Sequence, residues 1–317
     1  MTEPLLRRLS KRGERLTVGA LPWVAPVYRA MPQVDAVIEF PFVHGGLQWK
    51  ARRALARELK GRFDAAYVCP NSLKSALLPW WAGVPKRIGY HGEMRYGVLT
   101  QRIPNPAKGE RPPMVAFYSA LSGETGLESD KPALHLQPDT ADAVINHLGL
   151  RRQGYVVFAP GAEYGPAKRW PAKHFAKLAL QLEVPVVLLG SSKESELCQQ
   201  ITAMVEPSRP GQCLNFAGRT SLDQALAVIS VAKAMVSNDS GLMHVAAAFS
   251  VPQVAVFGSS SPLHTPPLND QARVLWLKND PQYQPALDCA PCYARECPLG
   301  HTRCLNDISA ADVARLL

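Results

Sequence analysis

AMVSNDSGLMHVAAA, residues Ala234–Ala248, decides the fold of the second half of this chain. Its apolar first part ends at Asn238 and Asp239, which is typical of a buried strand running to its carboxyl end. Ser240-Gly241 then predicts a tight turn, and the alanine-rich remainder predicts a helix. A strand–turn–helix unit of this kind directs the N–H groups of the helix N-terminus to the carboxyl edge of a parallel sheet, where anionic ligands bind in open α/β folds.

The polar residues of this stretch fit two interpretations. Asp239 repels a phosphate, so we predict that it accepts hydrogen bonds from hydroxyl groups, while Ser240 and the amide of Gly241 face a phosphate. His244 lies one helical turn beyond Ser240, on the same face. The alternative is a capped core helix, because Asp and Ser are common N-caps and a single histidine often only packs. The stretch alone leaves both open.

Length and composition are those of a globular protein with two domains. The chain has 317 residues, of which 47% are hydrophobic and 19% charged. No run approaches the roughly 20 apolar residues that span a bilayer, and the N-terminus lacks the apolar core of a signal peptide. We therefore expect a cytoplasmic location.

The formal net charge of +9 favours an anionic partner, although it also fits a role in solubility alone. The sequence contains neither a basic stripe interleaved with aromatic residues nor a zinc-finger spacing, so we expect no nucleic-acid partner. A nucleotide-bearing substrate or an anionic membrane surface fits better. The basic residues that would attract such a surface gather in the first half, at Arg52, Arg53, Arg57, Lys60 and Arg62.

Four of the seven cysteines lie close together, as Cys289-x2-Cys292-x4-Cys297-x6-Cys304. Four thiols at short spacing can bind zinc or an iron–sulfur cluster. The paired C-x2-C motifs of many zinc sites are absent, so a loop of reduced or transiently paired thiols is the alternative. We predict no metal among the site residues, and the sequence leaves the state of this loop open.

Short apolar runs alternate with helical segments along the whole chain, which predicts parallel sheets with crossover helices. We expect two Rossmann-like domains, residues 1–150 and 151–317. Strands are expected at residues 16–20, 36–40, 65–69, 87–90, 155–158, 185–189, 213–216, 234–238, 253–257 and 274–277. Helices are expected at residues 1–15, 23–31, 47–59, 75–82, 114–126, 171–182, 193–205, 221–230, 242–249 and 307–317.

A second glycine-bearing turn, Phe158–Pro171 (FAPGAEYGPAKRWP), follows an expected strand. Its glycines Gly161 and Gly165, with Ala162 between them, let the backbone approach a ligand closely. Lys168 and Arg169 offer positive charge to a phosphate. The alternative is a surface loop with solvated basic residues, but its place at the carboxyl end of a strand favours ligand binding.

Three more small, polar turns are expected at the same sheet edge, at residues 190–194, 218–222 and 258–262. Glu194 in the first of them can accept hydrogen bonds from ribose hydroxyls, or serve only the helix dipole. Together the turns predict a nucleotide pocket. The chain has no Walker P-loop, no G-x-S-x-G elbow and no D-x-D pair, so charge on a leaving diphosphate is met by Lys168, helix N-termini and His244.

Four motifs together resemble the ADP-heptose:lipopolysaccharide heptosyltransferases of glycosyltransferase family 9, most closely the heptosyltransferase II type. The motifs are Asn238–His244 (NDSGLMH), Phe158–Pro171, Pro70–Leu77 (PNSLKSAL) and Gly89–Gly97 (GYHGEMRYG). The resemblance implies a GT-B fold, two Rossmann-like domains facing a central cleft. It also implies inverting transfer of L-glycero-D-manno-heptose from ADP-heptose to the first heptose of the lipopolysaccharide inner core. The resemblance further implies a peripheral location on the inner face of the cytoplasmic membrane. It implies no cofactor.

The resemblance also assigns roles to individual residues. Lys168, Asp239 and His244 are the implied catalytic residues. The implied donor site consists of Gly161, Ala162, Lys168, Glu194, Asp239, Ser240, Gly241 and His244. The implied acceptor site consists of Asn71, Ser72, Lys74, His91, Glu93 and Arg95. A sugar-nucleotide epimerase of the same fold fits less well, because it has no use for an acceptor loop at residues 90–95.

The start of the chain departs from the family pattern. Family members open with a strand and a glycine-containing loop that carries an aspartate base, whereas this sequence starts inside the helix that follows. We therefore expect the first strand to be missing from the N-terminal sheet. Either the base lies upstream of the assigned start, or the chain is a catalytically silent nucleotide-sugar binder in which His91 and Glu93 are weak substitutes.

Overall fold

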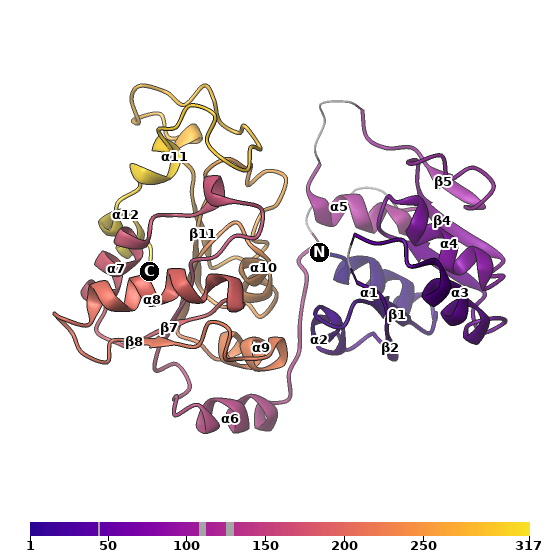
Figure 1. Ribbon diagram of the computed structural model, residues 1–317, viewed down its shortest axis with the longest axis horizontal. Coiled ribbons are helices and arrows are strands. Elements are labelled where there is room, and N and C mark those ends of the chain that lie inside the picture. Colours follow the sequence, from indigo (N-terminus) through magenta and orange to yellow (C-terminus); the bar gives the residue numbers. More distant parts are fainter. Residues whose placement is uncertain (44, 108–111, 125–129) are drawn as a thin grey trace. The chain divides into compact units, whose positions relative to one another are not determined.

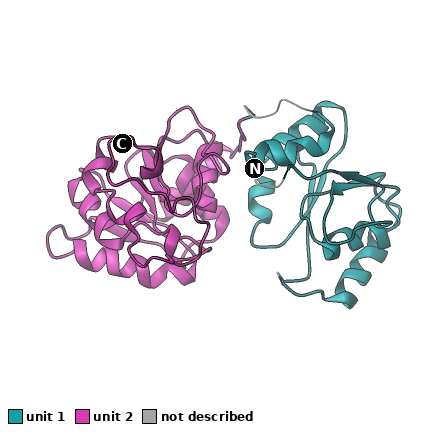
Figure 2. Ribbon diagram, turned by 90° about the horizontal axis from the view of Figure 1, so that it is seen from above, with its two compact units in different colours: residues 1–130 teal, residues 131–317 magenta. Residues whose placement is uncertain are grey.

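The chain forms two compact units, Met1–Asp130 and Lys131–Leu317 (Figure 2). The computed structural model describes residues 1–43, 45–107, 112–124 and 130–317. The division between the units precedes the boundary expected at residue 150. Helix α6 (Pro138–His147) buries Ala141 and Ile145 and packs on α9 (Leu222–Ser230), so this segment belongs to the second unit.

The second unit is built on a six-stranded parallel sheet with strand order β11-β10-β9-β6-β7-β8. Figure 1 labels β7, β8 and β11 of this sheet. Its strands are β6 (Val156–Ala159), β7 (Val186–Leu188), β8 (Cys213–Asn215), β9 (Ala234–Asn238), β10 (Gln253–Val256) and β11 (Ala272–Leu275). Every residue of β6, β7, β9 and β10 is buried, as expected for parallel strands covered on both faces. All the strands expected in this half are present, with β11 shifted two residues towards the N-terminus.

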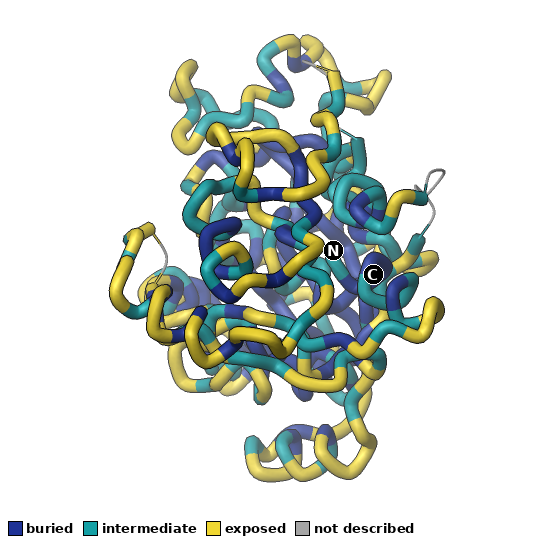
Figure 3. Tube along the Cα trace, turned by 90° about the vertical axis from the view of Figure 1, so that its right-hand side faces the viewer, coloured by how far each residue is buried: buried dark blue, intermediate teal, exposed yellow. Residues whose placement is uncertain are grey.

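Helices cover both faces of this sheet. Val254 and Val256 of β10 face the core formed with α7 (Ala172–Gln181), α8 (Ser195–Val205) and α12 (Ala310–Ala314). The alternating Ala255 packs on the other side, against Met243 of α10 (Gly241–Ala248). Figure 3 colours the Cα trace by burial, and the protruding loops in it are mostly exposed. Shorter elements are η2 (Pro166–Lys168), η3 (Ser192–Glu194), η4 (Leu277–Asn279) and α11 (Arg303–Asn306).

The first unit contains two separate parallel sheets. One pairs β1 (Thr17–Ala20) with β2 (Ala36–Glu39), and the other has the order β3 (Ala65–Val68), β4 (Lys86–Tyr90), β5 (Gln101–Ile103). Among the described residues no strand joins β1 to β3. Strand β5 was not expected from the sequence, because its three residues lack an apolar pattern and are held by backbone pairing with β4.

The helices of the first unit are α1 (Glu3–Lys11), α2 (Ala25–Arg29), α3 (Trp49–Glu58), α4 (Leu73–Trp81), α5 (Met114–Ser119) and η1 (Ala120–Ser122). Helices α5 and η1 occupy most of the helix expected over residues 114–126. Residues 125 and 126 of that prediction lie outside the described part. Among the described residues, every helix is too short or too polar to span a lipid bilayer.

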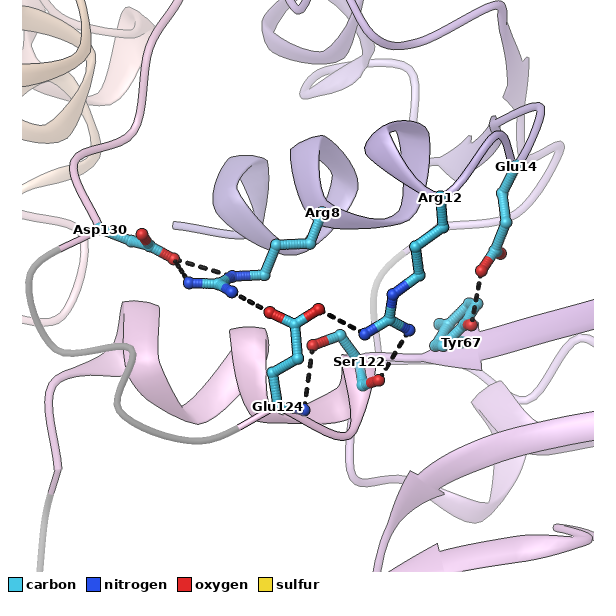
Figure 4. A network of polar contacts seen from close by, with 7 residues as sticks. All are labelled: Arg8, Arg12, Glu14, Tyr67, Ser122, Glu124 and Asp130. Carbon is cyan, nitrogen blue, oxygen red and sulfur yellow. Dashed lines mark hydrogen bonds and ion pairs between the residues drawn. The ribbon is translucent and has the colours of Figure 1, made fainter.

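Helix α1 is fixed to the end of the unit by a polar network as well as by Leu5 and Leu9, which are buried. Arg8 Nε donates to Asp130 Oδ2 over 2.9 Å, and its Nη1 pairs with Glu124. Arg12 also pairs with Glu124 and donates to Ser122 O over 2.9 Å (Figure 4). The first helix and the last described residues of this unit therefore form one cluster.

Candidate functional site

The chemistry-bearing turns of the second unit meet at one edge of its sheet. They follow the carboxyl ends of β6, β7, β8, β9 and β10, and all these strands run parallel. In an open parallel sheet this edge is where ligands bind. The convergence expected from the sequence is therefore present in the fold.

Lys168 and Asp239 form a partly buried ion pair at this edge. Lys168 Nζ lies 2.5 Å from Asp239 Oδ2, and the side chains are 18% and 6% exposed. The other carboxylate oxygen, Oδ1, accepts a hydrogen bond from Thr265 Oγ1 over 3.2 Å. The structure thus brings two residues of the predicted site into contact. It also adds Thr265, which belongs to none of the motifs in the sequence.

Asn238, the last residue of β9, holds both ends of the loop that carries Lys168. Its Oδ1 accepts a hydrogen bond from the N–H of Trp170 over 2.9 Å, and its Nδ2 donates to Pro160 O over 2.7 Å. Trp170 is fully buried, and its indole N–H donates to Ile308 O over 2.9 Å. Sequence reasoning overlooked this role, although an amide at the end of an otherwise apolar strand was a usable signal.

The N-terminus of α10 keeps groups available for a ligand. Ser240 is the N-cap residue, yet its side chain makes no capping bond, and its buried Oγ has no hydrogen-bond partner among the described residues. Gly241 is exposed, with open space where a Cβ would point. His244 is half-buried one turn further along. This geometry contradicts capping by Ser240, one part of the capped-core alternative, and leaves the amides of the first turn free of a side-chain cap.

Glu194 is engaged as a capping residue. Its Oε2 accepts hydrogen bonds from Ser191 N over 2.8 Å and from Ser191 Oγ over 2.5 Å, which completes a capping box. A Cβ added to Gly161 would lie 2.4 Å from Glu194 Cγ, so the β6 loop passes directly against this side chain. The alternative interpretation, in which Glu194 serves its own helix, therefore holds for Oε2, one of its two carboxylate oxygens.

Two residues of the same loop, Ala162 and Arg169, are joined by hydrogen bonds. Ala162 is buried, and its carbonyl accepts hydrogen bonds from Nε and Nη2 of Arg169 over 3.3 Å each. The guanidinium that was expected to offer charge to a phosphate is therefore bonded within its own loop. Lys168 carries the positive charge that faces Asp239.

The cysteine loop packs against the Lys168 loop. Arg295 O accepts a hydrogen bond from Ala167 N over 3.0 Å, and Tyr293 N donates to Ser259 O over 2.7 Å. A Cβ added to Gly165 would lie 2.5 Å from Arg295 O. The backbone of the cysteine loop thus forms one wall behind the turn that presents Lys168.

The four clustered cysteines are free thiols around a cavity of about 20 Å³ that His301 also lines. Burial, with a further contribution from the neighbouring thiols, raises the pKa of Cys304 to about 11. Within the described ranges no group of three or more His, Cys, Asp or Glu side chains is arranged to hold a metal ion. The four cysteines therefore line the wall of this cavity as free thiols.

The residues implied for the acceptor lie together in the first unit, in residues 70–75, which lead into α4, and in the loop that follows β4, up to residue 95. Glu93 Oε2 accepts a hydrogen bond from Leu73 N over 2.7 Å, which joins the two loops at the start of α4. Lys74 Nζ donates to Gly45 O over 3.2 Å, and Ser72 Oγ lies 2.7 Å from Ser75 Oγ. Asn71 and His91 are exposed.

Arg95 differs from the expectation, because it is buried rather than presented to a ligand. Its side chain is 1% exposed and donates to the carbonyls of Pro70 (2.9 Å), Tyr90 and Gly92 (3.3 Å) and to Asn71 Oδ1 (3.3 Å). Burial lowers the pKa of this guanidinium. Arg95 therefore positions the two loops.

A family model described as glycosyltransferase family 9 (heptosyltransferase) matches residues 52–301. The chain belongs to glycosyltransferase family 9. It is 42% identical over 294 residues to lipopolysaccharide heptosyltransferase 2 of Escherichia coli (strain K12), covering 87% of this chain and 84% of that protein. It is 38% identical over 270 residues to lipooligosaccharide heptosyltransferase 2 of Haemophilus influenzae (strain ATCC 51907 / DSM 11121 / KW20 / Rd), covering 80% and 78%.

The solved structure of E. coli ADP-heptose lps heptosyltransferase II matches this family member with a TM-score of 0.84 and 37% identity, over 99% of this chain and 92% of that one. A glycosyltransferase of family 9 from Veillonella parvula DSM 2008 shares the fold, with a TM-score of 0.79 and 20% identity. The family resemblance and the GT-B fold expected from the sequence are confirmed. The chain is a glycosyltransferase.

Replacing Asn238 tests whether its two hydrogen bonds hold the ends of the loop that carries Lys168. Asn238→Ala leaves the buried Trp170 N–H and Pro160 C=O without partners, so we expect the free energy of unfolding to fall by about 2–4 kcal/mol. Asn238→Asp keeps the acceptor for Trp170 but sets a second carboxylate oxygen against Pro160 O in a fully buried site, so it should also be destabilising, and less so at low pH, where a protonated carboxyl group can donate to Pro160 O. Denaturant unfolding measures both. The control is Asn146→Ala at an exposed residue of α6, which should change the free energy of unfolding little. If Asn238→Ala has an effect as small as that of the control, the two hydrogen bonds do not hold the loop.

Replacing Gly161 tests the close approach to Glu194. Gly161→Ala forces a methyl group against a side chain fixed by its capping bonds, so we expect a loss of stability of about 1–3 kcal/mol. Gly241→Ala, which meets open space, should change stability by less than about 0.5 kcal/mol. Thermal unfolding compares them, and indistinguishable midpoints would show that the loop does not depend on a glycine at residue 161.

Proposed function

We propose that this glycosyltransferase moves L-glycero-D-manno-heptose from ADP-heptose, with inversion, to the first heptose of the lipopolysaccharide inner core. The observation that carries the proposal is the Lys168–Asp239 pair beside the uncapped N-terminus of α10. The names of the relatives support the substrate class, since they are lipopolysaccharide or lipooligosaccharide heptosyltransferases. A solved structure of E. coli heptosyltransferase WaaC contains ADP-2-deoxy-2-fluoro heptose, but at 17% identity it shares only the fold.

On the donor side, the diphosphate meets positive charge from two sources. Lys168 Nζ is an ammonium held at the sheet edge by Asp239, and the first amides of α10 point out of a helix N-terminus. Ser240 Oγ, which has no hydrogen-bond partner among the described residues, adds a hydroxyl donor at this helix N-terminus. These groups stabilise the negative charge that grows on ADP as it leaves.

Asp239 takes a different part, because a carboxylate accepts hydrogen bonds but repels phosphate. With one oxygen on Lys168 and the other on Thr265, it is oriented before any ligand binds. We assign it to hydroxyl groups of the heptose. His244, on the same helix face as Ser240, contributes to the phosphate end.

On the acceptor side, inversion requires in-line attack by a hydroxyl whose proton passes to a base, for which His91 and Glu93 are the candidates in this part of the chain. The exposed Asn71 and His91, with Ser72 and Lys74, form the polar surface that we assign to the acceptor sugar. Glu93 and Arg95 hold the two loops in register through their bonds to Leu73 and to backbone carbonyls. The protein acts at the inner face of the cytoplasmic membrane, where a lipid-borne acceptor is anchored.

The first experiment measures ADP release by the purified chain. We expect release from ADP-heptose only when an inner-core acceptor carrying its first heptose is supplied, with one heptose added to the product by mass spectrometry. An acceptor without that heptose is the control. Acceptor-independent release contradicts transfer, and tight binding of ADP-heptose without any product identifies a silent binder instead.

The second experiment tests Lys168 kinetically. Lys168→Met removes the ammonium from the leaving diphosphate, so we expect kcat/KM to fall by about 10²–10³. Lys173→Met, at an exposed lysine on α7, is the matched control and should leave the rate unchanged. A Lys168→Met enzyme of undiminished kcat/KM would remove Lys168 from the mechanism.

A further inference from the structure

Helices α3 and α4 of the first unit present tryptophan side chains to solvent. Trp49 at the start of α3 is 43% exposed, and Trp80 near the end of α4 is 45% exposed. Leu47, just before α3, is 46% exposed. Large apolar side chains gathered on one surface indicate a contact with another apolar phase or partner.

These tryptophans form one continuous surface, because α3 and α4 pack against each other. Trp49 meets Trp81 edge-on, with ring centroids 4.5 Å apart, and Trp81 lies 6.4 Å from Trp80. The guanidinium of Arg53 lies over both Trp49 (4.9 Å) and Trp81 (5.2 Å). We call Leu47, Trp49, Arg53, Trp80 and Trp81 the tryptophan face.

Positive charge continues from this face along α3 and beyond it. The exposed basic residues are Lys50, Arg53, Arg57, Lys60 and Arg62. None of them belongs to an ion pair found among the described residues. Glu58 is the single acid of α3. The helix and the residues after it therefore carry a charge that the fold does not neutralise.

Arg52 is the exception among the basic residues expected to reach a membrane. It is 6% exposed, donates from Nε to Leu47 O over 2.6 Å and lies over the ring of Phe42. Arg52 therefore holds the segment before α3 in place, and the positive charge that is exposed to solvent comes from the other basic residues of this region.

We propose that the tryptophan face and the basic residues of α3 dock this enzyme onto an anionic lipid bilayer. Tryptophan is enriched at membrane interfaces, where its ring is partly buried and its N–H stays among polar headgroups. Lys and Arg close to such a surface add attraction that salt screens. The proposal rests on the proposed function, because a lipid-borne acceptor gives the enzyme a reason to approach a membrane.

Vesicle co-sedimentation of the purified full chain tests this docking. We expect binding to vesicles of phosphatidylethanolamine and phosphatidylglycerol to exceed binding to phosphatidylcholine by more than about tenfold, and to weaken as salt rises. Tryptophan emission should shift to shorter wavelength on binding. Equal or absent binding to both kinds of vesicle overturns the proposal.

Two sets of variants locate the surface. Lys50→Glu/Arg57→Glu/Lys60→Glu should weaken binding to anionic vesicles by more than about tenfold, and Trp80→Ala should weaken it several-fold. The matched controls are Lys173→Glu/Lys177→Glu, at exposed lysines of α7, and Trp23→Ala, at a tryptophan that is 65% exposed outside this face. If the controls weaken binding as much as the test variants, the assignment to this face is wrong.

Further readouts separate docking from transfer and from another partner. Heptose transfer to a delipidated, water-soluble acceptor should be unchanged in the test variants. Transfer without vesicle binding contradicts the docking alone, whereas vesicle binding without transfer contradicts the proposed function alone. Preferential binding of a single-stranded oligonucleotide over anionic vesicles, lost in Trp80→Ala, would assign this face to nucleic acid and overturn the lipid proposal.

Discussion

The buried amide of Asn238 is the constraint on which the candidate donor site depends. A side-chain amide that accepts from Trp170 N–H and donates to Pro160 O fixes the distance between the two ends of one loop. Because both bonds are buried, breaking either leaves a polar group without water or partner. The loop between these bonds carries Lys168, and its ammonium thereby lies 2.5 Å from Asp239, the residue that follows Asn238.

Other parts of the second unit support the same loop from behind. Glu194 presses against Gly161 while capping its own helix, and the carbonyl of Arg295 in the cysteine loop holds Ala167. Residues far apart in the sequence thus converge on a single turn. Glu194 and Asn238 are thus occupied in positioning this loop, whereas Ser240 Oγ has no hydrogen-bond partner among the described residues and does not cap α10. Preorganised groups of this kind cost no reorganisation when charge develops.

The sequence predicted the sheets well where burial imposes a pattern. Strand β9 and helix α10 were located closely because an apolar run changes to a polar turn and then to a helical pattern at Ser240-Gly241. Strand β5 was missed because its side chains carry no such pattern. The family resemblance placed Arg95 in the acceptor site, but a sequence motif does not show whether an arginine is exposed. In the fold four protein oxygens accept hydrogen bonds from its buried guanidinium. The capping role of Glu194 was readable from Ser191-x-x-Glu194.

A crystal structure of the protein with ADP-heptose tests the central claim most directly. The account predicts that Lys168 Nζ lies about 3 Å from a diphosphate oxygen, that the α10 N-terminus faces the same diphosphate, and that Asn238 keeps its bonds to Trp170 and Pro160. A diphosphate bound elsewhere, with Lys168 paired only to Asp239, would contradict it.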